Sequence, residues 1–175
     1  WKKTYAPILV DESLEIIPEW EKGKYQSSSK NQIYIYPGQG FGTGSHETTF
    51  LCLKLFTTLD LNKSSTCLDF GCGSGILGIA ALLFDAKHAI GIDIDQQALI
   101  ATKDNAERNG VSSKFDVFLP SEQPLTQVDL VLANVLAGPL RELSDTILAF
   151  VKPGGQLVLS GILERQVSDV IQAYQ

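Results

Sequence analysis

The sequence predicts an α/β fold in which a doubly wound, mostly parallel sheet follows a short β-rich segment. Two observations lead to this fold class. The stretch TCLDFGCGSG at residues 66–75 joins an apolar strand to a glycine-rich turn and then to a helix. From there to residue 175 strand-like runs alternate with helix-like runs, which is typical of parallel sheets with right-handed crossovers. We therefore expect a β-rich lead-in at residues 1–37 and a ligand-binding domain at residues 38–175.

The lead-in contains three short candidate strands. Residues 8–10 and 14–17 are apolar and flank a polar turn at residues 11–13, which predicts a hairpin or a two-strand extension. Residues 32–36 alternate in polarity and predict a third strand, which Pro37-Gly38 ends.

A glycine-rich loop follows at residues 38–49, with four glycines in seven residues. Such a loop is flexible or strongly bent. A helix is predicted from residue 45 or 46 to about residue 59. Two interpretations of the loop stay open: it is a simple connection, or it is a lid over a ligand, with Phe41 as an apolar cover and Thr49 as a polar contact.

The core elements follow from apolar runs and from the signals that bound them. Asn109-Gly110 is a helix C-terminal signal, and Lys152-Pro153 ends the last long helix. The predicted strands are 66–70, 88–93, 114–118, 128–133 and 156–160. The predicted helices are 74–84, 96–109, 138–151 and a last one that begins near residue 164.

The glycine turn points to a nucleotide-like ligand. Glycines at positions 73, 75 and 78 satisfy the pattern G-x-G-x-x-G, and glycines at 71 and 73 let a ligand approach the backbone closely. Asp69 lies at the carboxyl end of the first core strand, where a carboxylate repels a pyrophosphate and attracts a cation. S-adenosylmethionine carries an ammonium and a sulfonium group and no phosphate. The motif therefore favours this cofactor over a dinucleotide.

Two further strand ends carry candidate site residues. Asp93 lies about 20 residues past the glycine turn, where an acid accepts hydrogen bonds from an adenosine ribose. Asp95 is interpreted as the N-cap of the next helix. Asn134 is the candidate catalytic residue, because its side-chain oxygen can hold an amine in line with a methyl group. The alternatives are a solvated Asp93 and an Asn134 that caps the following helix, while Ser160-Gly161 is interpreted as a turn.

Composition narrows the class of protein. The apolar fraction of 44% and the charged fraction of 19% are typical of a soluble globular domain. A net charge of −6 disfavours direct nucleic-acid binding, and no apolar run is long enough to span a membrane. The three cysteines lack zinc-type spacing, so we expect no metal site and reduced thiols in a cytoplasmic protein.

The segments PGQGFGTGSHETT, LDFGCGSGILGIAA, GIDIDQQAL, DNAERNGV and DLVLANVLAGPL resemble those of the bacterial ribosomal protein L11 methyltransferase family, PrmA. The resemblance runs from about residue 1 to residue 163. It implies the Rossmann-like sheet of class I methyltransferases and an enzyme that uses S-adenosyl-L-methionine. It also implies transfer of methyl groups to lysine ε-amines and an N-terminal α-amine of a large-subunit ribosomal protein.

The resemblance carries the family's cofactor-binding positions to Thr49, Gly71, Asp93 and Asn134. Together with Asp69, Gly73 and Phe41 these residues make up the expected cofactor site. The family has a small N-terminal domain that recognises the substrate and two further strands at the carboxyl end of its sheet. We expect both to be absent from this chain, which leaves an open sheet edge.

Two other functions stay open from the residues themselves. One is an NAD-type oxidoreductase, because the glycine pattern and Asp93 suit either cofactor. The other is a partner-binding domain that keeps the fold without catalysis.

Overall fold

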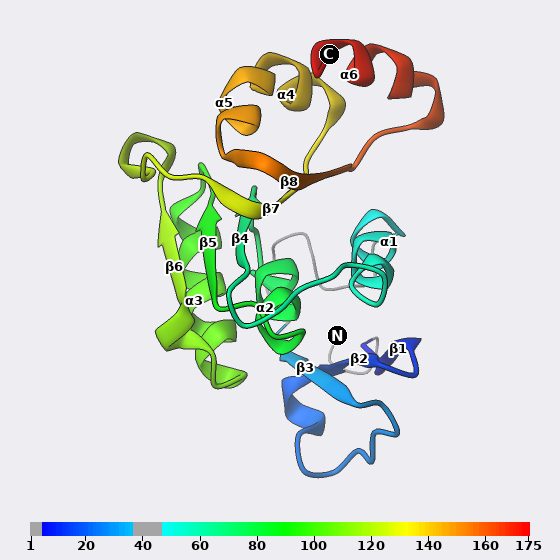
Figure 1. Cartoon of the computed structure of the whole chain (residues 1–175). Coiled ribbons are helices and arrows are strands. Elements are labelled where there is room, and N and C mark those ends of the chain that lie inside the picture. Colours follow the sequence, from blue (N-terminus) through cyan, green and yellow to red (C-terminus); the bar gives the residue numbers. More distant parts are fainter. Residues whose placement is uncertain (1–4, 37–46) are drawn as a thin grey trace.

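The structure is a computed structural model that describes residues 5–36 and 47–175 (Figure 1). Its strands form a sheet of order β1-β2-β3 and a parallel sheet of order β6-β5-β4-β7-β8. The strands are β1 (Ile8–Asp11), β2 (Leu14–Pro18), β3 (Asn31–Ile35), β4 (Thr66–Phe70), β5 (His88–Ile92), β6 (Phe115–Phe118), β7 (Val128–Asn134) and β8 (Val151–Ser160). The α-helices are α1 (Glu47–Leu55), α2 (Ile76–Leu83), α3 (Gln96–Arg108), α4 (Ala137–Glu142), α5 (Ser144–Ala149) and α6 (Val167–Ala173).

The five-stranded sheet confirms the predicted doubly wound architecture. Successive strands run outward from β4 to β6, and the chain then returns to place β7 on the other side of β4. The direction of winding therefore reverses between β4 and β7. Ligands of open α/β sheets bind at such a switch point, beyond the carboxyl ends of the strands.

Side chains of the central strand alternate between two apolar cores. Cys67 packs in a core with α1, α2 and the three-stranded sheet, whereas Leu68 and Phe70 pack in a core with α4 and α5. Both faces of β4 are buried because helices cover both faces of a parallel sheet. Figure 1 shows α4, α5 and α6 gathered beside β8, with β1–β3 at the opposite end of the molecule.

The amino-terminal segment forms the predicted hairpin. β1 pairs antiparallel with β2, and β3 then pairs parallel with β2. The loop between β2 and β3 folds back over Glu15, a buried acid that accepts hydrogen bonds from the hydroxyl groups of Tyr25, at 2.5 Å, and Ser27. These hydroxyls satisfy a carboxylate that burial alone would penalise.

Several predicted boundaries need correction. The helix predicted at 74–84 begins at Ile76, because Gly75 has a φ of +80° that a right-handed helix excludes. The helix predicted at 138–151 is two short helices, α4 and α5, separated at Leu143, whose φ of −103° and ψ of 16° leave helical geometry. β8 begins at residue 151 rather than 156, because Val151 pairs with Val128 on β7.

The helix predicted to run to about residue 59 ends at Leu55. None of the helices in the described part of the chain is long and apolar enough to cross a membrane.

Candidate functional site

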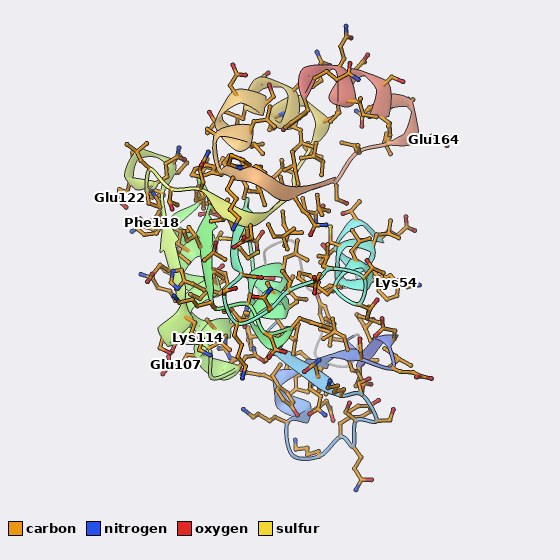
Figure 2. The ribbon with its side chains drawn as sticks, in the orientation of Figure 1. Lys54, Glu107, Lys114, Phe118, Glu122 and Glu164 are labelled. Carbon is orange, nitrogen blue, oxygen red and sulfur yellow. The ribbon has the colours of Figure 1, made fainter. Side chains whose placement is uncertain are left out.

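Three predicted site residues, Gly71, Asp93 and Asn134, lie with Ser160 in one row at the carboxyl ends of the strands. The sheet register pairs Phe70 with Ile92 and with Ala133. Gly71, Asp93 and Asn134 each follow one of these residues, and Asn134 pairs with Ser160 of β8. In Figure 2, Lys114, which precedes β6, and Phe118, which ends it, give the direction of the parallel strands.

The glycine turn is fixed to the end of β5. The backbone N–H groups of Gly71 and Cys72 donate to the carbonyl oxygen of Ile92, at 2.7 and 3.0 Å. Gly71 has a φ of +75°, and a Cβ atom there would lie 2.4 Å from Cγ1 of Val135. Only glycine therefore fits this position, both for its backbone angle and for the approach of the β7 end.

Asp93 and Asp95 have different roles at the start of α3. One Asp93 oxygen accepts a hydrogen bond from the N–H of Gly73 at 3.0 Å, and the other accepts from the N–H of Asp95. Asp95 accepts from the N–H of Gln97, which confirms it as the N-cap of α3. Asp93 is half-buried and joins β5 to the glycine turn, so it lies where an adenosine ribose was predicted. Its contact with a ribose stays a prediction.

Asp69 is buried beneath α2. It lies on the same face of β4 as Cys67, and its carboxylate accepts a hydrogen bond from the N–H of Gly78 at 3.2 Å. Burial raises the pKa of Asp69 to about 7, the hydrogen bond from Gly78 opposes the shift, and the charge of Asp93 adds to it. The sequence did not indicate this contact with α2, and a contact between Asp69 and a ligand stays a prediction.

Asn134 and Thr49 meet, although 85 positions separate them. The side-chain N–H of Asn134 donates to the Thr49 hydroxyl at 3.0 Å. The alternative that Asn134 caps the next helix is wrong, because the N-cap of α4 is Leu136. In the described part of the chain, Asn134 Oδ1 has no hydrogen-bond donor. An acceptor oxygen therefore stays available at the end of β7.

Ser160, interpreted from the sequence only as part of a turn, is the last residue of β8 and contacts the helix that carries Thr49. Its hydroxyl donates to the backbone carbonyl of Thr48 at 3.3 Å. A hydrogen bond with Ser160 also lowers the pKa of the Cys52 thiol against a larger rise that burial causes. These contacts hold the first turns of α1 over the ends of β7 and β8. A hydroxyl at the end of a strand that leads into the ligand edge was the available signal.

Phe41 and the rest of residues 38–46, most of the predicted loop at 38–49, lie outside the described residues, so neither interpretation of the loop is tested. The described residues of the site are Thr49, Asp69, Gly71, Gly73, Asp93 and Asn134. In residues 5–36 and 47–175, no group of three or more histidine, cysteine, aspartate or glutamate side chains could hold a metal ion.

Comparisons with family models and with curated proteins identify the same family. The chain matches the family described as Ribosomal protein L11 methyltransferase (PrmA) over residues 1–175. It is 63% identical over 177 residues to the protein of that name from Idiomarina loihiensis, which covers 100% of this chain and 59% of the relative. The protein of that name from Tolumonas auensis is 49% identical, covering 99% of this chain and 59% of the relative. The chain thus spans 59% of the length of these curated relatives.

Solved structures agree with this result. A crystal structure of ribosomal protein L11 methylase from Lactobacillus delbrueckii subsp. bulgaricus has a TM-score of 0.80 and 32% identity, covering 97% of this chain and 85% of that chain. An RNA methyltransferase from Salinibacter ruber, in complex with S-adenosyl-L-homocysteine, has a TM-score of 0.56 and 20% identity, covering 62% of this chain and 72% of that one. This second likeness is one of fold. Together with the strand order, these structures confirm the predicted Rossmann-like fold of class I methyltransferases.

Proposed function

The chain belongs to the ribosomal protein L11 methyltransferase family, PrmA, and from that premise we propose that it binds S-adenosyl-L-methionine and transfers its methyl group to an amine. One observation carries the proposal. The hydrogen bond between Asn134 and Thr49 leaves an acceptor oxygen in the same row of strand ends as the glycine turn and Asp93.

The charges at the strand ends fit this cofactor better than a dinucleotide. Asp69 and Asp93 are close enough for the charge of Asp93 to raise the pKa of Asp69. A pyrophosphate beside these two acids adds like charge, whereas an ammonium or sulfonium group offsets it. Gly71 and Gly73 carry no side chains, so a ligand can approach the backbone closely beside these two acids. The fold itself holds S-adenosyl-L-homocysteine in the Salinibacter ruber structure.

We assign the residues roles that follow from their positions. Asp93 is proposed to accept hydrogen bonds from the ribose hydroxyls, with Gly71, Gly73 and Asp69 beside the amino-acid part of the cofactor. Thr49 holds the Asn134 amide by accepting a hydrogen bond from its N–H. Phe41 remains part of the proposed site through the family resemblance alone.

Asn134 is proposed as the catalytic residue. Bound S-adenosyl-L-methionine supplies an electrophilic methyl group on a sulfonium. Asn134 Oδ1 accepts a hydrogen bond from the neutral amine and turns the nitrogen lone pair toward that methyl carbon. Transfer would break the sulfur–methyl bond as the nitrogen–methyl bond forms, leave neutral S-adenosyl-L-homocysteine, and release one proton from the methylated amine to solvent. Because methyl transfer is an in-line displacement, positioning of the amine is the main contribution expected from the protein.

The proposed substrate is a large-subunit ribosomal protein, L11, with methyl groups added to lysine ε-amines and the N-terminal α-amine. The names of the relatives support ribosomal protein L11 as the substrate, and the choice of amines rests on the family resemblance alone. We also propose that residues 1–37 form a lead-in and residues 38–175 the cofactor domain, which the two separate sheets support. A cytoplasmic location is proposed because Cys52, Cys67 and Cys72 are free and buried.

Two measurements test the function. Calorimetric titration with S-adenosyl-L-homocysteine is expected to show one site on the folded chain. Mass spectrometry is expected to show methyl groups on ribosomal protein L11 incubated with S-adenosyl-L-methionine. Asn134→Ala should lower the transfer rate by about tenfold or more, as expected when a positioning contact to the reacting atom is lost. Folded protein that gives no heat, or an Asn134→Ala variant as active as the unchanged chain, contradicts the proposal.

A further inference from the structure

Two side chains on one face of α3 donate hydrogen bonds to backbone carbonyl groups of the glycine turn. The Thr102 hydroxyl donates to the carbonyl oxygen of Gly73 at 3.1 Å, and the side-chain N–H of Asn105 donates to that of Ser74 at 2.9 Å. Thr102 and Asn105 are three positions apart on the helix and both are buried. The turn that lines the proposed cofactor site is therefore attached to α3 by two side chains.

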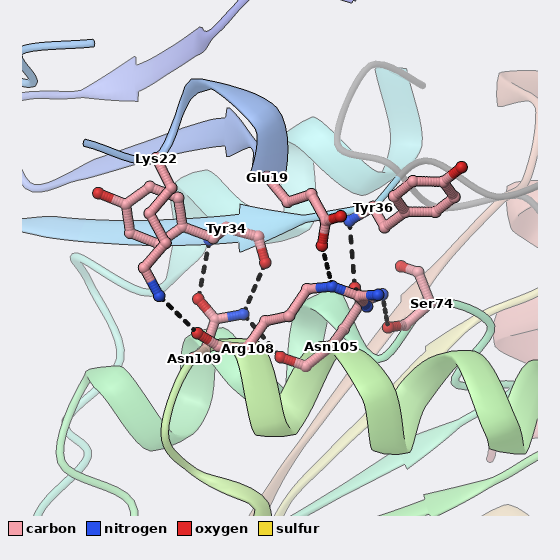
Figure 3. Close-up of polar contacts among 8 residues, drawn as sticks. All are labelled: Glu19, Lys22, Tyr34, Tyr36, Ser74, Asn105, Arg108 and Asn109. Carbon is pink, nitrogen blue, oxygen red and sulfur yellow. Dashed lines mark hydrogen bonds and ion pairs between the residues drawn. The ribbon is translucent and has the colours of Figure 1, made fainter. Parts of the chain in front are cut away.

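The same face of α3 holds the free edge of β3. The backbone N–H of Tyr34 donates to Asn109 Oδ1 at 2.8 Å, and the Asn109 side-chain N–H donates to the Tyr34 carbonyl at 2.7 Å. The backbone N–H of Tyr36 donates to Asn105 Oδ1 at 3.2 Å. Figure 3 shows the two asparagines side by side along β3. They satisfy main-chain groups that an edge strand otherwise leaves exposed.

Asn105 is the residue that the two sets of contacts share. Its oxygen accepts from Tyr36 and also from the Arg108 guanidinium at 3.0 Å, so its N–H group is turned toward Ser74. Arg108 is itself held in an ion pair with Glu19, just after β2. Lys22 donates to the Arg108 carbonyl at 3.2 Å. One buried amide thus connects the three-stranded sheet to the cofactor turn (Figure 3).

We propose that Asn105 is a positioning residue for the cofactor. Its hydrogen bond to the Ser74 carbonyl holds the shape of the glycine turn, and its contacts with Tyr36 and Arg108 hold Asn105 itself against the three-stranded sheet. This inference rests on the proposed function. Asn109 provides a matched comparison, because it contacts β3 twice and, within residues 5–36 and 47–175, makes no hydrogen bond with the turn. Loss of Asn109 therefore weakens docking of the sheet and leaves the turn attached to α3, while loss of the Asn105 N–H frees the turn.

The test compares Asn105→Asp with Asn109→Ala in the 175-residue chain. Asn105→Asp keeps an acceptor for Tyr36 and Arg108 but replaces the donor to Ser74 with a second acceptor. We expect S-adenosyl-L-homocysteine to bind Asn105→Asp about tenfold more weakly, which is the order expected for one lost buried hydrogen bond. We expect Asn109→Ala to lower the Tm yet keep the calorimetric Kd within about twofold of the unchanged chain. Hydrogen exchange of residues 71–75 should rise only in Asn105→Asp.

The outcomes separate this inference from the proposed function. If the unchanged chain does not bind S-adenosyl-L-homocysteine, the proposed function fails. If it binds, and Asn105→Asp and Asn109→Ala have equal Kd values, the positioning role is wrong and the proposed function stands. If Asn105→Asp does not fold, Asn105→Ala removes the same donor without placing a second acceptor beside Ser74. A Kd for Asn105→Ala equal to that of Asn109→Ala then overturns the inference.

Discussion

Replacement of Asp69 by asparagine is expected to stabilise the protein at alkaline pH while weakening its hold on the cofactor. Asp69 is buried, and its hydrogen bond in the described structure comes from Gly78. Its pKa is raised to about 7 from an ordinary value of 3.8, so the folded chain binds this proton more tightly than the unfolded chain. The contribution of Asp69 to the free energy of unfolding therefore falls as pH rises from about 4 to about 7, and is constant above that.

The size of the effect follows from these two pKa values. At roughly 1.36 kcal/mol per pKa unit, the full difference corresponds to about 4 kcal/mol at high pH. Between pH 5 and pH 8 the wild-type chain should lose about 2–3 kcal/mol that Asp69→Asn, which does not titrate, keeps. The same variant should bind S-adenosyl-L-methionine about tenfold more weakly, because the cation loses a nearby negative charge.

Urea unfolding at pH 5 and pH 8, without ligand, measures the stability effect. Asp104→Asn, at an exposed acid on α3, controls for the loss of one negative charge. The reasoning is refuted if Asp69→Asn changes the free energy of unfolding equally at both pH values. Unchanged cofactor affinity in Asp69→Asn would remove Asp69 from the cofactor site and leave it a purely structural acid.

Two further substitutions test the geometry of the strand ends. Gly71→Ala should lower the free energy of unfolding by about 2 kcal/mol or more, since a positive φ and a Cβ 2.4 Å from Val135 both oppose it; chemical denaturation checks this, and a neutral result would contradict the described turn. Ser160→Ala should weaken S-adenosyl-L-homocysteine binding about threefold by loosening α1, in line with about 0.5–1 kcal/mol for one half-buried hydrogen bond. Titration calorimetry measures this, and equal Kd values would leave Ser160 without a role in the site.

The sequence predicted the core of the fold well, for a physical reason. β4 has the predicted bounds, Thr66–Phe70, because a short apolar run before a glycine turn has few alternatives in an α/β chain. Asp95 was also predicted correctly, since N-capping depends on local backbone alone. Of the predicted strand-end residues, Asp93 and Asn134 lie in one row, as expected for parallel strands that end at one edge, whereas Asp69 pairs with Gly91 and Leu132, two positions earlier.

What the sequence did not predict depends on contacts between distant residues. The hydrogen bonds that Asn105 and Asn109 accept from Tyr36 and Tyr34 span 69 and 75 positions. No local pattern indicates that two asparagines at the end of α3 take the place of a neighbouring strand. The direction of the Asp69 side chain depends on which face of β4 receives α2. The break at Leu143 lies within a segment whose apolar residues are spaced as in one continuous helix.

A crystal structure of the chain with S-adenosyl-L-homocysteine tests the central claim most directly. We predict that the ribose hydroxyls lie against the Asp93 carboxylate, that the amino-acid part lies over Gly71 and Gly73, and that the sulfur faces Asn134. A nucleoside bound away from the glycine turn, or a sulfur atom turned away from Asn134, would contradict the account.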